Sequence, residues 1–422
     1  MTDTPPSGEE LAQGLLSIPP DLAEAWERIH EGVEELIPDE ELLAKLIRSK
    51  REGRPLRVKL GADPSAPDLH VGHAVVLRKL RQFQDLGHTV VFIIGDGTAR
   101  IGDPTGRSET RPQLSEEEVK RNAETYLRQV FLILDESKTE IEYNSRWFNQ
   151  LTFEDVIRLL ASATVARMLE RDDFQKRHQA GQAIHLHEFM YPLMQGYDSV
   201  MVRCDIEVGG TDQKFNLLVG RDLQREAGQE PQCVLTTPLL VGLDGQSKMS
   251  KSLGNHIGIT EAPDEIYGKA MSITDGMMEE YFRLALGRPA PEVRRLMEDL
   301  QAGRVHPRDL KARLARELTA LYHSEEAARA AEERFNRIHR QRQSPDEVGQ
   351  LTLAADAGGR AWICRVLVEA GLARSNGEAR RLIRGGGLRI NGERVEDETM
   401  ELARGVHQIQ AGKRRFLKIT LT

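Results

Sequence analysis

Short apolar runs alternate with helical stretches in the first half of the chain. Residues 56–60 have the composition of a short strand, and Val76, Leu80 and Phe83 follow at helical spacing. A glycine then stands where a helix would end, and residues 90–94 are apolar throughout, as expected for a strand buried on both faces. A strand, a helix and a second strand joined by short loops are typical of a parallel crossover unit.

The same pattern returns further along the chain. "DIEVGG", residues 205–210, predicts a strand that ends in glycines and is followed by a helix. We therefore expect an α/β fold with a Rossmann-like parallel sheet that binds ligands at its carboxyl edge. Residues 260–342 are charged, with apolar residues at helical spacing, and predict a helical domain. A basic helix, a glycine break and an Asn391-Gly392 turn then predict a small α+β domain with a hairpin.

These patterns divide the chain into five predicted parts. They are an N-terminal tail and helix (1–30), a Rossmann-like catalytic domain (31–243), a polar loop with a helical domain (244–340), a linker (341–356) and a small C-terminal domain (357–422). The tail is expected from its acidic, proline-bearing composition, and the linker from the polar stretch "QRQSPDEVGQ".

Charge is distributed unevenly along the chain. The 422 residues carry a net charge of -8, with 58 Lys and Arg against 66 Asp and Glu. Residues 356–422 hold 13 basic and 8 acidic side chains, a net of +5, which leaves 45 basic and 58 acidic side chains for the rest. A small basic module on an acidic body indicates an anionic partner at that end, such as nucleic acid.

The cysteines and the apolar runs indicate the compartment. Cys204, Cys233 and Cys364 are far apart in sequence and include no Cys-x-x-Cys pair, so they predict neither a zinc knuckle nor a disulfide framework. Such cysteines favour a reducing cytoplasm. No apolar run approaches the roughly 18 residues of a membrane span, and the first residues lack the segments of a signal peptide. We therefore expect a cytoplasmic protein without membrane attachment.

The stretch "DLHVGHA" carries the first candidate chemistry. His70 and His73 follow the first predicted strand and lie on one face of the helix that begins there. Gly72 leaves room for a flat ligand against the backbone, and helix N-termini favour phosphate. Two imidazoles at such a terminus can donate hydrogen bonds to phosphate oxygens. The alternatives are a zinc pair, for which the surrounding sequence offers no third ligand, and a pair that only caps the helix.

The polar loop "GQSKMSKSLGN", residues 245–255, carries the second candidate chemistry. It has two lysines, three serines and two glycines but almost no apolar residue. The ammonium groups of Lys248 and Lys251 suit a polyphosphate that must be gripped and then released. A solvated surface loop is the alternative. The His-x-Gly-His motif more than 170 residues upstream favours the phosphate interpretation.

Together the two motifs resemble the HIGH and KMSKS signatures of the class I aminoacyl-tRNA synthetases. Lys248 to Ser252 matches KMSKS letter for letter, and His70 to His73 matches HIGH. Three further stretches, "GDPTGRSETR" (102–111), "YPLMQGYD" (191–198) and "GGTDQKFN" (209–216), resemble the tyrosyl-tRNA synthetase family. The resemblance runs from about Leu36 to the end of the chain.

The resemblance implies a site for ATP and for the chemistry at its phosphates. In the family, the carboxylate of the amino acid displaces pyrophosphate, and the residues that stabilise this transition state correspond to His70, His73, Lys248, Lys251, Arg107 and Arg111. The implied ATP-binding residues, with Asp212 at the ribose, are Gly61, Asp63, Ser65, Gly72, Gly210, Asp212 and Lys251. ATP is then a substrate that brings its own Mg²⁺, and the protein itself binds no metal.

The resemblance to the family also implies a site for tyrosine. Asp103, Tyr191 and Gln195 would hold the α-ammonium group, Asp198 would reach the phenolic hydroxyl, and Gln213 would contact the amino acid or the adenylate. Tyr191, Gln195 and Asp198 lie four and three residues apart, so one helical face can present all three.

The basic C-terminal module resembles the S4-type RNA-binding domain. The implied contacts to the tRNA for tyrosine come from Arg380, Arg381, Arg384, Lys413, Arg414 and Arg415. Phosphate contacts from such residues give an affinity that falls with salt. The alternative for any single arginine is a solvated helix face. The family further implies a homodimer.

One position departs from the family. A branch of the family has a tyrosine where this chain has Lys59, and that tyrosine gives the substrate hydroxyl a second partner. The sequence leaves open what replaces this contact. His185 and His187 in "HLHEFM" have the appearance of metal ligands, but no H-E-x-x-H follows and we interpret them as structural.

Competing interpretations come from other protein classes. A small nucleotidyltransferase also uses His-x-Gly-His with ATP, but it does not account for KMSKS, the helical domain or the basic C-terminus. An RNA-binding regulator that descends from a synthetase and has lost catalysis is the second alternative. Tryptophan is the nearest competing amino acid, and the stretch from Tyr191 to Asp198 favours tyrosine.

Overall fold

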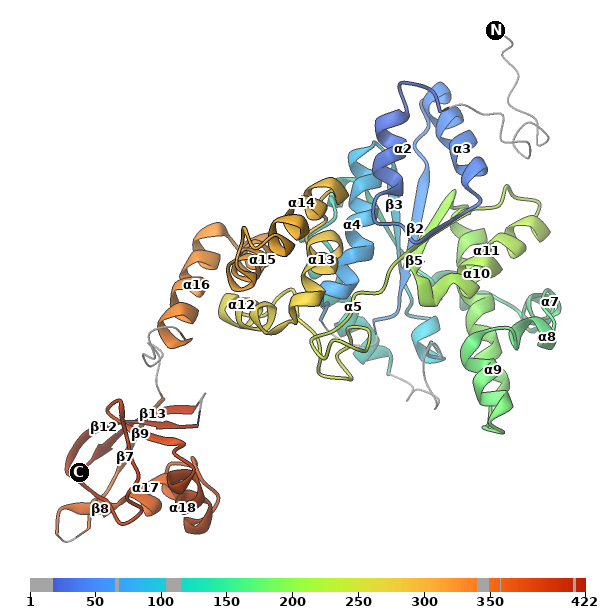
Figure 1. Ribbon diagram of the computed structural model, residues 1–422. Helices are drawn as coiled ribbons and strands as arrows, with labels where there is room; N and C mark the ends of the chain where they lie inside the picture. The colour runs from blue at the N-terminus through green and yellow to red at the C-terminus, as the bar shows by residue number, and fades with distance from the viewer. Residues whose placement is uncertain (1–17, 65–67, 104–114, 340–348, 357, 413–414) are drawn as a thin grey trace. The chain divides into compact units, whose positions relative to one another are not determined.

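The computed structural model describes residues 18–64, 68–103, 115–339, 349–356, 358–412 and 415–422. The chain forms two compact units, Met1–Glu325 and Glu326–Thr422 (Figure 1).

A six-stranded sheet forms the centre of the first unit. Its strand order is β1-β6-β5-β2-β3-β4, and all neighbours are parallel except β1 and β6. The strands are β1 (Glu35–Ile37), β2 (Arg57–Ala62), β3 (Thr89–Ile94), β4 (Thr139–Tyr143), β5 (Ile206–Gly210) and β6 (Cys233–Thr237). The predicted parallel α/β sheet is therefore confirmed, and the antiparallel edge strand β1 is an addition that the sequence analysis did not predict.

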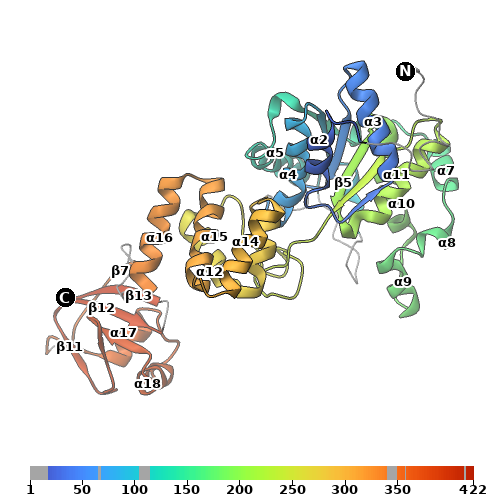
Figure 2. The same ribbon diagram turned by 45° about the horizontal axis from the view of Figure 1, so that its top comes forward.

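Helices cover both faces of this sheet. The helix α4 (Val71–Asp85) lies on one face, and the paired helices α10 (Met190–Val202) and α11 (Lys214–Glu226) lie on the other (Figures 1 and 2). Of the α4 side chains at the predicted helical spacing, Leu80 and Phe83 are buried and Val76 is half-buried. Gly87, with a φ of 91°, follows the helix and permits the sharp turn into β3. The predicted crossover unit of β2, α4 and β3 is confirmed.

Further helices complete the first part of the chain. They are α2 (Ala23–His30), α3 (Asp39–Glu52), α5 (Glu116–Val130), α6 (Ser145–Phe148), α7 (Phe153–Ala161), α8 (Val165–Met168) and α9 (Asp172–Gln179). The tail expected at the N-terminus lies outside the described residues up to residue 17.

The predicted helical region after residue 260 is confirmed. It contains α12 (Pro263–Ser272), α13 (Met278–Glu280), a π-helical turn (Tyr281–Ala285), α14 (Ala290–Gln301), α15 (Pro307–Tyr322) and α16 (Glu325–His339). The helices α12, α14 and α15 each have a proline in their first turn, where the missing N–H group costs no hydrogen bond.

The second unit has the predicted α+β character. After α16, a five-stranded sheet of order β10-β9-β12-β13-β7 and the pair β11-β8 accompany two helices in the described residues. The strands are β7 (Gly349–Leu353), β8 (Arg360–Trp362), β9 (Leu388–Ile390), β10 (Glu393–Arg394), β11 (Glu401–Ala403), β12 (Gly405–Ala411) and β13 (Arg415–Leu421), and the helices are α17 (Ile363–Glu369) and α18 (Asn376–Arg384). Asn391 and Gly392, with φ values of 52° and 89°, turn the chain between the antiparallel strands β9 and β10, as predicted.

The segment predicted as a linker, 341–356, has two parts. Residues up to 348 lie outside the described residues. The strand β7 follows and pairs in parallel with β13, so it belongs to the C-terminal sheet. Its alternation of apolar and polar residues, "GQLTL", is the signal for a strand that the polar residues before it concealed.

The three cysteines, Cys204, Cys233 and Cys364, are buried and unpaired. None of the helices in the described part of the chain combines the length and the apolar composition that a membrane crossing requires.

Candidate active site

The structure brings the His-x-Gly-His motif and the lysine-bearing loop together. His70 is the N-cap residue of α4, and the segment that leaves the loop pairs with the chain just before this helix. The backbone N–H of Val71 donates to the Ile257 carbonyl (2.9 Å), and that of Ile259 donates to the Leu69 carbonyl (3.1 Å). Two motifs that are distant in sequence therefore share a short β-bridge.

The two imidazoles are stacked and uncharged at neutral pH. Their ring centroids lie 3.7 Å apart. Burial, reinforced by the neighbouring cations, lowers the pKa of His70 to about 2 and that of His73 to about 4. His73 Nδ1 accepts a hydrogen bond from the His70 backbone N–H (3.2 Å), so the ring hydrogen of neutral His73 is on Nε2. His73 also lines the central cavity, where this ring hydrogen is a donor for an anionic oxygen.

The loop has internal order despite its polar composition. Asn255 is 4% exposed and closes the loop with its side chain. Its amide donates to Asp244 (2.9 Å) and to the Lys248 carbonyl (3.2 Å), and its oxygen accepts from the Ser250 N–H (2.7 Å). This arrangement fixes the backbone around the lysines and leaves their long side chains directed outward.

Both loop lysines are paired with aspartates of the sheet edge. Lys248 Nζ lies 2.6 Å from Asp212, which follows β5, and Lys251 Nζ lies 3.1 Å from Asp68, which precedes α4. The ammonium groups of Lys248 and Lys251 are therefore each held by a carboxylate from a different part of the sheet edge. A phosphate between them would compete with these two carboxylates.

A cavity of about 230 Å³ opens at the carboxyl ends of β2 and β5, as the fold rule for parallel sheets predicts. Its polar lining residues are Asp63, His73, Asp103, Tyr126, Tyr191, Gln195, Glu207 and Gln213. Apolar side chains that include Leu60, Leu77 and Phe92 complete its walls. A wider depression of about 750 Å³ is lined by Asp212 and Lys248 together with other charged side chains.

The residues predicted for the α-ammonium group lie together at the small cavity. Asp103 accepts hydrogen bonds from Gln213 Nε2 and from Arg171 Nη2, both at 3.0 Å. The Tyr191 hydroxyl donates to Asp63 (2.9 Å), which also accepts from Thr98 (2.6 Å). Asp63, predicted near ATP, is thus linked directly to the predicted tyrosine site.

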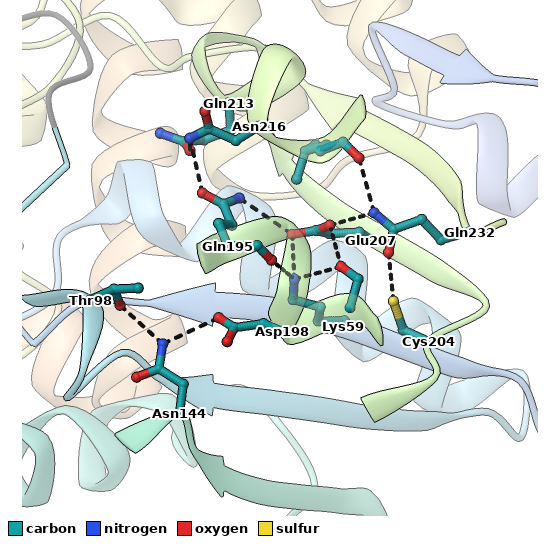
Figure 3. A network of polar contacts seen from close by, with 12 residues as sticks. Lys59, Thr98, Asn144, Gln195, Asp198, Cys204, Glu207, Gln213, Asn216 and Gln232 are labelled. Atoms are coloured by element: carbon teal, nitrogen blue, oxygen red, sulfur yellow. Dashed lines mark hydrogen bonds and ion pairs between the residues drawn. The ribbon is translucent and has the colours of Figure 1, made fainter. Parts of the chain in front are cut away.

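Asp198, predicted at the phenolic hydroxyl, lies deeper and does not line the described cavity. It is 3% exposed and accepts from Trp147 Nε1 (2.9 Å). It also accepts from Asn144 Nδ2 (3.2 Å), as Figure 3 shows. Burial raises the pKa of Asp198 to about 7, although Lys59 and the two hydrogen bonds oppose the shift. The charge of this carboxylate is therefore sensitive to its neighbours near neutral pH.

Sequence reasoning missed several polar residues around the site. Glu207 forms a buried ion pair with Lys59 at 2.9 Å, and both side chains are at most 1% exposed (Figure 3). Opposite charges within two apolar strands were an available signal for this pair. No such signal marked Arg171, because the stretch "LERDDF" has the composition of an ordinary charged surface segment. Gly95 was also missed, although a Cβ there would lie 2.0 Å from Asp63 Oδ1.

The glycines predicted near ATP differ in their surroundings. A Cβ on Gly210 would lie 2.8 Å from both Asp212 Oδ1 and Leu239 Cδ2, so a side chain there would displace these two groups. A Cβ on Gly61 would meet no atom within 4 Å, which leaves open space above that strand end. Ser65, Arg107 and Arg111 lie outside the described residues.

The predicted RNA contacts of the second unit are exposed. Arg380 lies over the Trp362 ring at 5.4 Å, and Arg384 donates to both Glu398 oxygens at 2.7 and 2.8 Å. Arg381 and Arg415 are also exposed, whereas Lys413 and Arg414 lie outside the described residues.

The histidine pair in "HLHEFM" has a local structural contact. His185 donates its backbone N–H to Glu188 (2.9 Å), and Glu188 is paired with Arg177. In the described ranges no three His, Cys, Asp or Glu side chains are grouped as metal ligands.

Comparisons with known proteins identify the family. The family model "tRNA synthetases class I (W and Y)" matches residues 50–340, and the S4 domain model matches residues 362–406. The chain is 54% identical over 407 residues to the "Tyrosine--tRNA ligase" of Moorella thermoacetica, covering 96% of this chain and 98% of that protein. It is 55% identical over 400 residues to the protein of the same name in Geobacter sulfurreducens, with 94% and 99% covered.

Solved structures agree with this relationship. The tyrosyl-tRNA synthetase of Archaeoglobus fulgidus, solved in complex with L-tyrosine, matches with a TM-score of 0.60 at 27% identity, covering 74% of this chain and 100% of that one. A C-terminally truncated mitochondrial tyrosyl-tRNA synthetase of Aspergillus nidulans matches with a TM-score of 0.60 at 25% identity, with 79% and 96% covered. The chain therefore belongs to the tyrosyl-tRNA synthetases, within the class I family of tRNA synthetases.

Proposed function

We propose that this chain is a tyrosine–tRNA ligase. The carboxylate of tyrosine attacks the α-phosphorus of ATP to give tyrosyl-adenylate and pyrophosphate, and the 3′-terminal ribose of the tRNA for tyrosine then takes the tyrosyl group. The observation that carries this proposal is the convergence of the His70–His73 motif and the Lys248–Lys251 loop beside one cavity. The relatives with more than 50% identity, all called tyrosine–tRNA ligases, support it.

The first step needs no general base, because the substrate carboxylate is already ionised at neutral pH. Catalysis depends on alignment and on donors placed where negative charge develops. Neutral His70 and His73 serve as hydrogen-bond donors, and Lys248 and Lys251 supply positive charge to the phosphates. The remaining proposed cations, at the departing pyrophosphate, are Arg107 and Arg111.

ATP binds at the edge of the sheet with its ribose at Asp212. The close fit at Gly210 supports this role, since a side chain there would fill the space beside the Asp212 carboxylate. Gly61, Asp63, Ser65 and Gly72 line the approach of the nucleotide. Mg²⁺ arrives with ATP and is held mainly by phosphate and water oxygens.

Tyrosine binds with its ammonium group toward Asp103, Tyr191 and Gln195 and its hydroxyl toward Asp198. A carboxylate with two neutral acceptors is chemically suited to a primary ammonium group. Gln213 is oriented by its hydrogen bond to Asp103 and contacts the amino acid or the adenylate. A buried hydroxyl acceptor selects tyrosine over phenylalanine, because phenylalanine leaves that acceptor unpaired.

The tRNA is held in part by the second unit, through Arg380, Arg381, Arg384, Lys413, Arg414 and Arg415. The exposure of the described arginines supports phosphate contacts. We also propose a homodimer in the cytoplasm. Phe153, Val165 and Leu186 are 81%, 62% and 82% exposed, which supports an apolar contact surface between copies of this chain. Sedimentation equilibrium tests this assembly.

Tyrosine-dependent ATP–pyrophosphate exchange tests the proposed function. A tyrosine–tRNA ligase exchanges labelled pyrophosphate into ATP only when tyrosine is present. Exchange that does not depend on an amino acid would indicate a nucleotidyltransferase instead. RNA binding without any exchange would indicate a regulator without catalysis, and exchange driven by tryptophan would reassign the substrate.

A further inference from the structure

Lys59 has no hydrogen left for a substrate. Its ammonium group donates to the Gln195 carbonyl (2.8 Å) and to Ser199 Oγ (2.8 Å), and it lies 2.9 Å from Glu207 Oε1. These three contacts account for the three N–H bonds of an ammonium group. Lys59 therefore cannot replace the tyrosine of other family members as a direct partner of the substrate hydroxyl (Figure 3).

Glu207 lines the cavity, but its acceptor sites are occupied. Its Oε1 accepts from Lys59 and from Gln195 Nε2 (3.3 Å). Its Oε2 accepts from Ser199 Oγ (3.0 Å) and from Gln232 Nε2 (2.5 Å). A carboxylate has about four lone-pair sites, so Glu207 offers no further site for a substrate hydroxyl.

Asp198 differs from Glu207 in this respect. It accepts one hydrogen bond at each oxygen, from Trp147 and from Asn144. About two of its four lone-pair sites therefore remain for a phenolic hydroxyl. Asp198 is the stronger acceptor when it is ionised, because a protonated carboxyl offers fewer lone pairs and adds a donor.

The charge on Asp198 depends on few groups. Lys59 on β2 and Glu207 on β5 act on it in opposite directions, and the effect of Lys59 is the larger. Its other contacts, Asn144 and Trp147, are uncharged. Cys204, which follows α10, faces Lys59, and burial raises the pKa of its thiol to about 12, so it is neutral as well. Lys59 is thus the cation of this cluster.

We propose that Lys59 is a positioning residue for amino-acid selection: its bonds to Gln195 and Ser199 hold α10 on either side of Asp198, the acceptor of the tyrosine hydroxyl, and with Glu207 it fixes Gln195. The second function follows from geometry, since Lys59 holds the Gln195 carbonyl while Glu207 accepts from its side-chain amide. In this chain the hydroxyl of the substrate tyrosine then has Asp198 as its charged partner. Lys59 acts through Asp198 and does not contact the hydroxyl. This inference rests on the proposed function.

The test uses two full-length variants and the pH dependence of kcat/KM for tyrosine in ATP–pyrophosphate exchange. Lys59→Met/Glu207→Gln removes both charges of the Lys59–Glu207 pair, so that neither partner of the pair is left as an unpaired ion. Because Lys59 acts more strongly on Asp198 than Glu207 does, the acid limb should move to higher pH. If the acid limb moves up by one pH unit, kcat/KM at pH values below the limb falls about tenfold. Tyrosine-over-phenylalanine selectivity at pH 7 should fall with it.

Glu207→Gln alone keeps Lys59 and should move the acid limb to lower pH. A merely structural role would lower kcat/KM by the same factor at every pH, so opposite shifts in the two variants support the inference. An unmoved limb in both variants would overturn it, and Glu207→Gln decides the question if the double variant does not fold. A parent enzyme without tyrosine-dependent exchange would instead contradict the proposed function itself.

Discussion

Met249 of the lysine-bearing loop packs directly against Gly72 of the His-x-Gly-His motif. A Cβ on Gly72 would lie 3.4 Å from Met249 Cβ and 3.0 Å from the Cε1 and Nδ1 atoms of His70. Gly72 therefore lets the loop and the His70 ring approach the start of α4 together. The two motifs meet at a contact between backbone and side chain as well as through their charged groups.

Gly72→Ala should slow adenylate formation about tenfold and leave the free energy of unfolding near that of the parent. Alanine favours a helix over glycine by about 1 kcal/mol, which offsets the small shift forced on His70. Pre-steady-state fluorescence or quenched-flow kinetics measures the rate. Gly268→Ala in α12 is the matched control, because a Cβ there meets no atom within 4 Å. Equal rates of adenylate formation in Gly72→Ala and Gly268→Ala would mean that Gly72 has no part in catalysis.

Lys248→Ala and Lys251→Ala should each slow adenylate formation by about 100-fold, the typical loss of one preorganised electrostatic contact. Tyrosine affinity should change little, because these lysines contact Asp212 and Asp68 and do not line the small cavity. Lys311→Ala is the control, since Lys311 forms an equally short ion pair with Asp275 (2.6 Å). A pre-steady-state rate unchanged in both loop variants would remove the loop from the mechanism.

Asp198→Ala should erode the preference for tyrosine over phenylalanine. A lost buried hydrogen bond costs about 1–3 kcal/mol, which corresponds to roughly a tenfold to hundredfold fall in the ratio of kcat/KM values. Exchange assays with each amino acid measure this ratio. Asp222→Ala, on the exposed side of α11, should keep the parental ratio. Undiminished selectivity in Asp198→Ala would mean that another group reads the hydroxyl.

Acid should destabilise the first unit through its buried histidines. Burial lowers the pKa of His88 to about 4, against a partly opposing effect of Asp205. The unfolded chain therefore binds more protons than the native state between pH 6.5 and 4, and stability falls as the pH falls through this window. His88 alone contributes at most about 3 kcal/mol to this loss.

His88→Asn should reduce this acid sensitivity, because asparagine retains an acceptor for the Leu56 N–H but does not titrate. The measurement is the urea midpoint at pH 7 and at pH 5. His178→Asn, at an exposed position, is the control. If the fall in midpoint were as large in His88→Asn as in the parent, another group would account for the acid sensitivity.

Removal of the part of the second unit that begins with β7 should separate the two steps of the reaction. A chain that ends at residue 345 omits β7 together with the sheet to which it belongs. It should keep tyrosine-dependent exchange within about twofold and lose most tRNA charging at physiological salt, since phosphate contacts dominate such binding. Full charging by this shortened chain would argue against the RNA-binding role.

Much of the architecture was readable from the sequence because buried strands and amphipathic helices leave periodic signals. The apolar run at residues 90–94 became β3, and Asn391-Gly392 became the predicted hairpin turn. The strand β1 was missed because three residues, Glu35–Ile37, are too few to show a period. The strand β7 was concealed by the polar stretch that precedes it.

The candidate site was predicted less completely, for a physical reason. Motifs identify groups that touch substrates, so His70, His73 and the loop lysines were found by pattern. Groups that act through another residue leave no motif. Arg171 is recognised only when folding places it beside Asp103, and the one sequence signal for Glu207 was a charge within an apolar strand. Lys59 was noticed as a departure, but its saturated hydrogen bonds could be counted only in three dimensions.

The bridge between Val71 and Ile257 is made of main-chain atoms, and this affects how the enzyme can vary through evolution. Side chains near the junction can be exchanged without loss of the two backbone hydrogen bonds. The number of residues from Met249 to Ile257 cannot be changed in the same way. An insertion or deletion in that interval would pull one motif out of register with the other, so the length of this segment should be more strictly preserved than its composition.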